Sequence, residues 1–442
     1  MSARVIVPAL LLLAGCATSM RDREWLSREL QERTGASLRG DSEARMPPDV
    51  VVEDGLDESE VVSLVLWRNP ALRAELSRID AAFASLDEAK RPANPQLTLA
   101  GPTGPTTAVA TLVAPIESLW QIPARAKAAA RDADVAGEDV LMRALDLVRD
   151  ARLLHVELGL ATERAAIRSE LARVAEAVAH IAAVRASLGD ISPLEERVLA
   201  ADAQASADAR DLAEVDIALA ESRLRAVLAL DEGRELQPSF ATDLATPPAL
   251  PTLVAFARQA RPDARSADLA IEAATAREGW ERSRVVNLSA VVEAYWHQSP
   301  GPGMRLGGRA ELPIFNWNVG GIGRTEAEVQ RAAAQHEQLA RSVIVEVTAA
   351  HARFVQATKS RARFETEVLP ALDAALEMAE HGFRSGDQTY LVVLDVLRRA
   401  GEARLRRAEL VAEQRRALCE LERAIGARLR NVDGENELRG TP

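Results

Sequence analysis

The sequence predicts a mainly α-helical protein with a small β component, built as two copies of a hairpin of very long helices. Aromatic residues make up only 3% of the 442 residues, a composition typical of long helices that pack on small side chains. Gly189-Asp190 and Gly386-Asp387 each follow a long helical pattern, and they stand 197 residues apart. Pro115-Ile116 and Pro313-Ile314 recur at a spacing of 198. Two landmarks at nearly one spacing indicate a duplicated unit of about 200 residues.

The N-terminus has the features of a bacterial lipoprotein signal. A basic residue precedes the apolar run 5–14, and Leu13-Ala14-Gly15-Cys16 follows it. This motif resembles a lipobox, with cleavage before Cys16 and acylation of that residue; the alternative is an ordinary signal peptide with an incidental Cys. Ala17 follows, which resembles the outer-membrane sorting pattern of Gram-negative lipoproteins. Because Cys419 is the other Cys of the sequence, acylation of Cys16 leaves no pair for an intramolecular disulfide.

The chain divides into six segments. They are a signal peptide at 1–15, a lipid-anchored polar leader at 16–57, a first repeat at 58–230, a linker at 231–251, a second repeat at 252–426 and a polar tail at 427–442. The leader is expected to be extended. Each repeat contains a β-hairpin, at 94–115 and at 287–313, and a helical hairpin with its tip at residue 189 or 386.

Both β-hairpins follow from local patterns. Residues 92–116 carry no charge, but their Pro and Gly residues exclude a membrane helix and leave two short strands, Gln96 to Ala100 and Thr106 to Ala114. Residues 288–296 and 304–312 alternate between apolar and more polar positions, which is typical of strands. A soluble sandwich shows this alternation, and so does a membrane barrel. Two hairpins cannot close a barrel alone, so a barrel would need several chains.

Each β-hairpin leads into a long helical stretch, 123–187 or 323–384, of about sixty residues. Unbroken, each would span roughly 90 Å at 1.5 Å per residue. Coiled-coil packing or the wall of a helical tunnel needs such a length. Return helices follow the tips, and Ser192-Pro193-Leu194-Glu195 has the pattern of a capping box at the start of the first one.

The sequence contains no recognisable catalytic motif. Its six His residues make no metal-ligand spacing, and it has no Cys cluster, nucleophile elbow, phosphate loop or dinucleotide fingerprint. We therefore expect no enzyme, no cofactor and no metal site. The net charge of −12 argues against nucleic acid as a partner. The acidity either keeps the surface soluble or lines a passage that tolerates cations.

The order of these features resembles the TolC-like outer-membrane efflux proteins over nearly the entire mature chain. Asn69-Pro70-Ala71-Leu72 resembles the family's early helix entry, and Ala114-Pro115-Ile116-Glu117 resembles its first strand-to-helix junction. Leu312-Pro313-Ile314-Phe315-Asn316, with Asn318-Val319-Gly320-Gly321, resembles the second junction, most of all in the CzcC-like heavy-metal branch. Each motif is weak by itself, whereas all of them in order, with the core repeated, make a specific pattern.

The resemblance implies a homotrimer in the outer membrane of a Gram-negative bacterium. Each chain would give four strands to a twelve-stranded β-barrel and its long helices to a periplasmic α-barrel tunnel. The channel would be a passive conduit for export, with heavy-metal cations favoured, and would work with a periplasmic adaptor (membrane fusion protein) and an RND-type inner-membrane transporter. A drug-efflux or type I secretion channel stays open. Outside this class, the alternatives are a lipid-anchored structural coiled-coil envelope protein and a lipoprotein hydrolase.

The resemblance also implies site residues at the tips and at a periplasmic gate. The tips that dock the adaptor correspond to Leu188, Gly189 and Asp190 and to Ser385, Gly386 and Asp387. The gate corresponds to Asp395, Gln388 and Glu195, with one aspartate ring of the family retained at Asp395 and the other lost at Val392. The alternative for Asp395 is a solvated helix carboxylate paired with Arg398 or Arg399, which lie on the same side of the helix.

Overall fold

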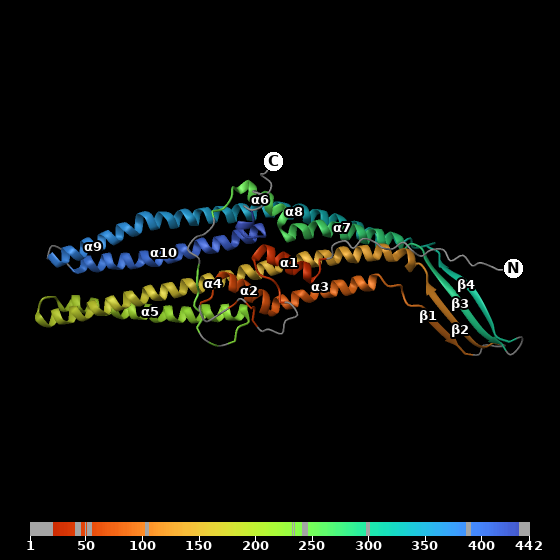
Figure 1. Ribbon diagram of the computed structural model, residues 1–442, viewed down its shortest axis with the longest axis horizontal. Coiled ribbons are helices and arrows are strands. Elements are labelled where there is room, and N and C mark those ends of the chain that lie inside the picture. The colour runs from red at the N-terminus through yellow and green to blue at the C-terminus, as the bar shows by residue number, and fades with distance from the viewer. Residues whose placement is uncertain are drawn as a thin grey trace. The chain divides into compact units, whose positions relative to one another are not determined.

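The computed structural model shows two compact units connected by long helices (Figure 1). It describes residues 21–39, 46–48, 50, 55–101, 106–231, 233, 235–240, 246–297, 301–385 and 390–432. The first unit, here called the sheet unit, comprises Met1–Leu26, Ile79–Gly137 and Glu272–Glu328. The second, here called the helical unit, comprises Ser27–Arg78, Glu138–Ile271 and Val329–Pro442.

The elements follow the predicted order. The helices are α1 (Arg23–Thr34), α2 (Glu58–Arg68), α3 (Pro70–Ala89), α4 (Ser118–Leu188), α5 (Pro193–Leu228), α6 (Leu250–Ala260), α7 (Pro262–Ser283), α8 (Val319–Arg363), the π-turn η2 (Phe364–Val368), α9 (Leu369–Ser385) and α10 (Tyr390–Ile425). The strands are β1 (Gln96–Ala100), β2 (Thr106–Pro115), β3 (Asn287–His297) and β4 (Gly303–Glu311). Among the described residues, none of these helices combines the length and apolarity that a membrane-spanning helix needs.

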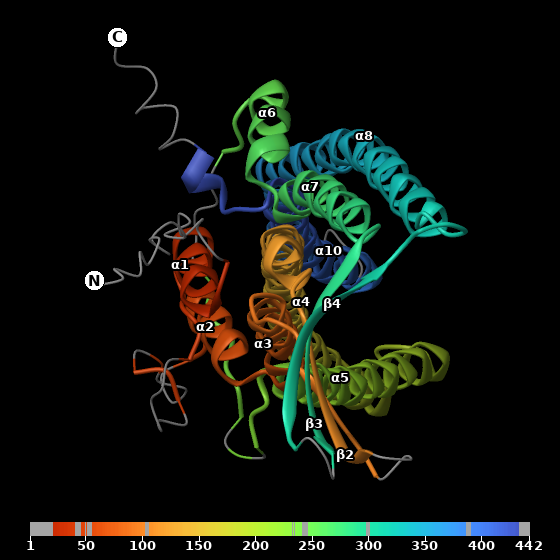
Figure 2. The same cartoon turned by 90° about the vertical axis from the view of Figure 1, so that its right-hand side faces the viewer.

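The four strands form one antiparallel sheet in the order β1-β2-β3-β4, visible in Figure 2. The two hairpins are far apart in the sequence and pair through β2 and β3, with Ala110 opposite Ala294. One register shift interrupts this pairing, between Thr106 and Ala108. The predicted strands are thus confirmed to within one residue at each end, and the hairpins form a single sheet.

In the helical unit, α9, α10, α4 and α5 lie side by side in that order (Figure 1). Two buried clusters hold α10 in the middle. Val343, Val347 and Phe354 of α8 pack with Leu421 and Ile425 of α10. On the other side, Val156 and Leu160 of α4 pack with Ala408 and Ala412 of α10. The outer sides of α5 and of α8–α9 form the two edges of this helical layer.

Local signals in the sequence account for the first helical tip. α4 ends at Gly189, whose φ of +79° is the left-handed conformation that Gly adopts without penalty. The amide of Asp190 donates to the carbonyl of Arg185 at 2.9 Å, which satisfies one of the last carbonyls of α4. Ser192 then begins α5 with a capping box: its hydroxyl accepts from the Glu195 amide, and the Glu195 carboxylate accepts from the Ser192 amide. The predicted turn and cap are confirmed.

Two expectations need correction. The leader is not wholly extended, because α1 lies within it and buries Leu26 and Leu30 completely. The tail begins as part of the core, because Leu429 and Val432 pack with the α8–α10 cluster. The second long helical stretch is present as expected, and η2 interrupts it between α8 and α9.

α1 is fixed by its last turn. Arg33 donates to the carbonyl of Gly426 at 2.7 Å and to that of Ala260 at 2.9 Å. Gly426 follows the end of α10 and Ala260 ends α6, so one guanidinium stabilises the C-terminal ends of two helices, where the helix dipole favours a cation. The helix is held by this polar contact as well as by its two buried Leu residues.

Candidate channel-forming sites

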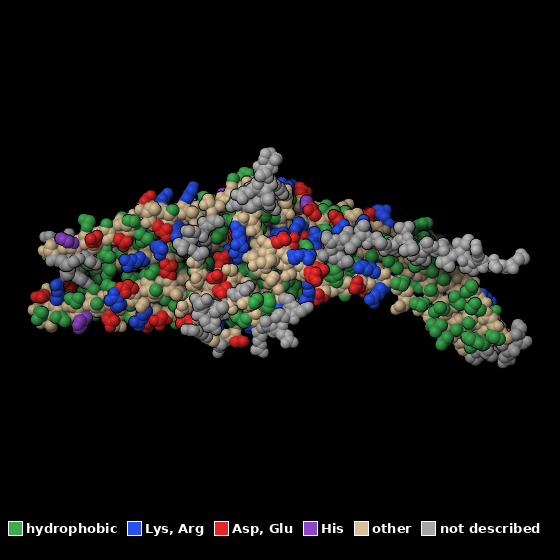
Figure 3. Space-filling model, in the orientation of Figure 1, with side chains coloured by type: hydrophobic (Ala, Val, Ile, Leu, Met, Phe, Trp, Pro, Cys, Tyr) green, Lys and Arg blue, Asp and Glu red, His purple; other side chains and the backbone are tan. Residues whose placement is uncertain are grey.

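One face of the sheet is apolar and the other carries its charges. Strand pairing places Leu97, Leu112, Val292 and Leu306 in one row across all four strands, and Leu99, Ala110, Ala294 and Met304 in a second row on the same face. The row between them, on the opposite face, is Thr98, Thr111, Glu293 and Arg305. In the single chain the apolar face is uncovered: Leu99 is 73% exposed and Leu306 is 71% exposed, and Figure 3 shows hydrophobic side chains gathered over the strands. A sheet with this division fits lipid on one side and water on the other.

The sheet also has two open edges. In the described part of the chain, β1 and β4 are the terminal strands of the sheet, and their outer edges carry no pairing strand. Unpaired edges expose a row of backbone N–H and C=O groups that bind another strand readily. Because all pairs within the sheet are antiparallel, β1 of one copy has the direction needed to extend β4 of another antiparallel to it.

The junction between β4 and α8 is fixed by Asn318. Its φ of +57° is a left-handed conformation that Asn tolerates, and its amide nitrogen donates to the carboxylate of Glu281 at 2.8 Å. A Cβ at Gly321 would overlap the side chains of Asn318 and Glu281. Burial raises the pKa of Glu281, but hydrogen bonds from Asn318 and Arg284 outweigh it and hold that pKa below its usual value. The Asn-Val-Gly-Gly motif therefore connects the last strand to α7 and α8.

The structure describes all three residues of the first predicted tip but only Ser385 of the second. Leu188, Gly189 and Asp190 lie at the free end of the α4–α5 hairpin, with Leu188 71% exposed. Apart from its neighbours in sequence, no atom of the described residues lies within 4 Å of where a Cβ on Gly189 would stand, so the rest of the described chain does not support this tip. Ser385 ends α9 and donates its hydroxyl to the carbonyl of His381 at 3.1 Å. Gly386, Asp387 and Gln388 lie outside the described residues.

Both described residues of the predicted gate, Asp395 and Glu195, form contacts within the single chain. Asp395, on α10, accepts from Arg399 Nε at 2.8 Å and from Arg398 Nη2 at 3.3 Å. The hydrogen bond from Arg398, together with Arg399, holds the pKa of Asp395 below its usual value. Glu195 accepts from the amide of Ser192 at 2.9 Å, in the capping box of α5. Each carboxylate thus has a local structural role in addition to any role at a gate.

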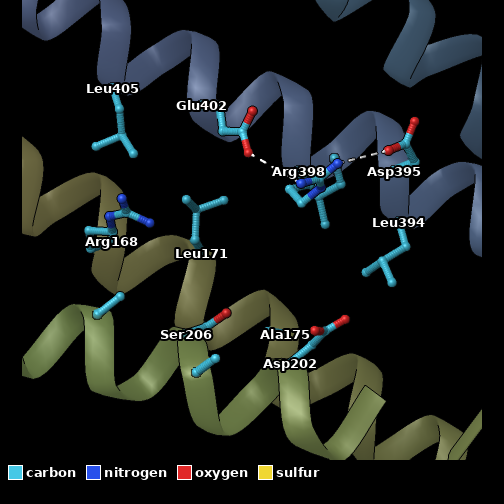
Figure 4. Close-up of a pocket in the computed structure, with 13 residues that line it drawn as sticks. Arg168, Leu171, Ala175, Asp202, Ser206, Leu394, Asp395, Arg398, Glu402 and Leu405 are labelled. Carbon is cyan, nitrogen blue, oxygen red and sulfur yellow. Dashed lines mark hydrogen bonds and ion pairs between the residues drawn. The ribbon is translucent and has the colours of Figure 1, made fainter. Parts of the chain in front are cut away.

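A groove of about 410 Å³ brings Asp395 together with residues that the sequence did not single out (Figure 4). It lies between α4, α5 and α10, with Leu171, Leu394 and Leu405 on its walls. Its charged lining residues come from three helices: Arg168 from α4, Asp202 from α5, and Asp395, Arg398 and Glu402 from α10. Each of these helices is a separate pattern in the sequence, so their side-by-side packing had to be seen to find the groove.

The described part of the chain was compared with what a metal site or a reactive thiol requires. It holds no group of three or more His, Cys, Asp or Glu side chains arranged to bind a metal ion. Cys419 is buried in α10, and burial raises the pKa of its thiol to about 12. A thiol with so high a pKa is a packing group, since the thiolate is the reactive form. Cys16, the predicted acylation site, lies outside the described residues.

The fold is similar to that of solved structures of membrane channels. The chain superposes on the Campylobacter jejuni CmeC outer-membrane channel with a TM-score of 0.73, at 14% identity and covering 96% of this chain and 94% of that one. It superposes on CusC, described for transmembrane channel formation, with a TM-score of 0.71, at 18% identity and covering 90% and 97%. These similarities establish the fold.

A curated relative is more similar in sequence. The cobalt-zinc-cadmium resistance protein CzcC of Cupriavidus metallidurans is 28% identical over 378 residues, which are 83% of this chain and 88% of the relative. No protein-family model matches the chain. The resemblance to TolC-like channels, and to the CzcC-like branch among them, is confirmed.

Proposed function

We propose that this protein is the outer-membrane channel of a tripartite efflux system and conducts its substrate passively to the exterior. The observation that carries the proposal is the sheet, which has one continuous apolar face, one charged face and two open edges. A sheet of this kind is complete only when its edges are paired and its apolar face is covered. Similarity to CzcC and to solved outer-membrane channels supports the same function.

The proposed assembly is a homotrimer. Pairing β1 of one copy with β4 of the next gives three times four strands, a closed barrel of twelve with its apolar face toward lipid. The helical layer has matching open edges. Along α5, exposed positions recur at spacings of 4 and 3, as coiled-coil contacts do, and they include Leu194, Val198, Leu212, Val215 and Leu219. Packing of this edge on the α8–α9 edge of the next copy would close a periplasmic tunnel.

The proposed partners follow from the free ends of the helical unit. The hairpin tips, Leu188 to Asp190 and Ser385 to Asp387, would dock a periplasmic adaptor that connects the channel to an inner-membrane transporter of the RND type. Cys16 would carry lipid and hold the leader at the outer membrane. The division of the chain into lipid-anchored leader, two repeats, linker and tail belongs to this proposal.

We propose divalent heavy-metal cations as the substrate class. The name of CzcC specifies cobalt, zinc and cadmium, and this chain shares 28% identity with it over most of its length. A drug-efflux or secretion channel would share the assembly and differ only in cargo.

The gate is proposed at the tip-proximal part of the helical hairpins, where Asp395, Gln388 and Glu195 are placed by resemblance to the family. In a trimer, three Asp395 carboxylates around one axis would attract cations into the throat. Their pairing with Arg398 and Arg399 in the single chain reduces that field, so the strength of the ring depends on how far the trimer separates these pairs.

Metal resistance tests the function directly. The full chain is expressed with a CzcC-type adaptor and transporter in a Gram-negative strain that lacks its own channel, and growth is measured in cobalt, zinc and cadmium salts. Restored resistance that depends on all three components is the expected result. Resistance that does not depend on this chain would contradict the proposal.

Trimer mobility on unheated gels separates the channel from a lipid-anchored structural coiled-coil protein, since a barrel trimer resists detergent until it is heated.

A further inference from the structure

The helix that packs along α10 is interrupted by one π-turn. α8 ends at Arg363, η2 covers Phe364–Val368, and α9 begins at Leu369. The amide of Leu369 donates to the carbonyl of Phe364, five residues earlier instead of the usual four. A π-turn holds one more residue than an α-turn, so the residues beyond it are rotated by about 100° relative to an uninterrupted helix.

Before the π-turn, the buried face of α8 follows a coiled-coil spacing. Its fully or nearly fully buried residues alternate at intervals of 4 and 3: Val343, Val347, Ala350, Phe354 and Ala357. They pack on Leu418, Leu421 and Ile425 of α10 in a single core. This spacing is the one that keeps an apolar stripe facing a neighbouring helix.

After the π-turn, the buried face is displaced by one residue. Continuing the spacing from Ala357 would place residues 371, 375 and 378 on the face toward α10. Instead, Ala371 is exposed, Met378 is 74% exposed, and Ala379 is buried. Leu372, Ala375 and Leu376 are all half-buried. Because Ala371 and Met378 are exposed and Ala379 is buried, the packed positions are 372, 376 and 379, each one residue later, which is the displacement that one inserted residue produces.

Polar contacts fix the π-turn in its place. Arg361 donates to Gln414 of α10 at 2.9 Å and to Glu365 of the π-turn at 3.1 Å. Arg407 of α10 lies 3.4 Å from Glu365 and 3.2 Å from Glu163 of α4. Glu365 is thus the link between the π-turn and two other helices. Half-buried charged groups replace apolar packing at this level of the layer, which makes it the place where the apolar stripe can change register.

We propose that η2 sets the register of α9 against α10 and that α9 has a second register available to it. If the extra residue moves along α9 toward the tip, Ala371, Ala375 and Met378 replace Leu372, Leu376 and Ala379 on the face toward α10. Both sets are apolar, so both registers can pack. The register in the structure covers two Leu residues and is the more stable one, because Leu buries more apolar surface than Ala.

The second register turns the α9 part of the hairpin about its own axis and leaves α8 in place. A shift of this kind exchanges hydrogen bonds within one helix and repacks one face, as other two-state helix movements do. It would carry a rotation from η2 to Ser385, at the end of α9. The two registers do not depend on the proposed function. Only the claim that this rotation opens or closes a channel rests on it.

Thiol accessibility in the full chain tests the register. Single Cys residues are introduced as Ala371→Cys or Leu372→Cys in a Cys419→Ala background, and the protein without an added Cys supplies the background rate. With η2 intact, position 371 should react with a maleimide about tenfold faster than position 372. Deletion of Thr366, an exposed residue of the π-turn, removes the extra residue and should leave this order unchanged, because residue 372 then takes the place that 371 would have in a continuous helix. An inverted order after the deletion would overturn the proposal.

An exchange of side chains tests the same register by stability. The variant Ala371→Leu, Leu372→Ala, Ala375→Leu, Leu376→Ala moves the two Leu residues to the second register. With η2 intact, α9 can change register and keep the two Leu residues on the face toward α10, whereas the protein that lacks Thr366 has no extra residue to move. The exchange should therefore lower the Tm less with η2 intact than in the protein that lacks Thr366. Equal losses of Tm in the two backgrounds would overturn the proposal. If the deletion alone does not fold, the exchange alone decides: it should protect Met378→Cys and expose Ala379→Cys, and the original order would overturn the proposal.

Discussion

The carboxylate of Asp395 is paired with two guanidinium groups, those of Arg398 and Arg399. Asp395 and Arg398 both line the groove in Figure 4. Because Arg398 and Arg399 lower its pKa, Asp395 stays ionised at every pH above the ordinary range for Asp. Any stabilisation from these exposed pairs is present above that range and is lost as the pH falls through the lowered pKa. Asp395 therefore carries a fixed negative charge that Arg398 and Arg399 partly neutralise.

Asp395→Asn in planar bilayers should lower cation selectivity and weaken block by multivalent cations. Removing one of its partners, as in Arg399→Gln, should do the opposite, because it unmasks the carboxylate. Asp373→Asn is the matched control: Asp373 is also exposed and also lies near an arginine, Arg404 at 3.8 Å, but it precedes the tip. Equal conductance, selectivity and block in wild type and Asp395→Asn would leave Asp395 as a solvated surface carboxylate.

At the scale of single elements, local signals predicted what local energetics determine. The Gly at position 189 and the Ser192–Glu195 cap fix where α4 ends and α5 begins, and local patterns placed all four strands. α1 was not predicted because half of its residues are charged, and because its position depends on Arg33 and on helix ends more than two hundred residues away. The π-turn was not predicted for a similar reason. Its one-residue displacement is visible only when the burial of α9 against α10 is known.

The α4–α5 tip offers a test at this scale. Gly189→Val should cost about 1–2 kcal/mol, because the left-handed conformation places a Cβ against the following carbonyl. The cost is confined to the local backbone, since no described residue beyond the sequence neighbours of Gly189 comes within 4 Å of where that Cβ would stand. We expect crosslinking to the adaptor to fall while trimers still assemble. Gly189→Asn is the matched control, since Asn tolerates this conformation better than Val.

A contrary result for the tip would be informative. If trimers disappear and crosslinking per remaining trimer is unchanged, the tip supports folding of the hairpin and is not a docking site. The second tip cannot serve as the comparison through Gly386, which lies outside the described residues. Leu188 lies next to Gly189 and is 71% exposed, so Leu188→Ser tests the same proposed docking surface without a change to the backbone.

At the scale of the whole molecule, the described part of the single chain has surfaces that it cannot complete by itself. The sheet leaves an apolar face uncovered and two edges unpaired, and the helical layer leaves an exposed apolar stripe along α5. The fold and its position in a known class followed from the order of motifs, whereas the two faces of the sheet required the register between β2 and β3, which joins hairpins nearly two hundred residues apart. Assembly with further copies is the simplest way to satisfy all of these surfaces together.

Two neighbouring residues of β1 distinguish a membrane sheet from a soluble one. Leu97 lies in an apolar row and Thr98 in the adjacent polar row, and both are exposed in the single chain. If the apolar face contacts lipid, Leu97→Arg should destabilise the inserted protein by up to about 2–4 kcal/mol near the bilayer midplane, while Thr98→Arg, facing water, should cost little. The measurement is the fraction of heat-modifiable trimer in outer membranes over a urea series. In a soluble sheet whose faces both meet water, Leu97→Arg would be neutral or favourable, so equal behaviour of the two variants would contradict the membrane assignment.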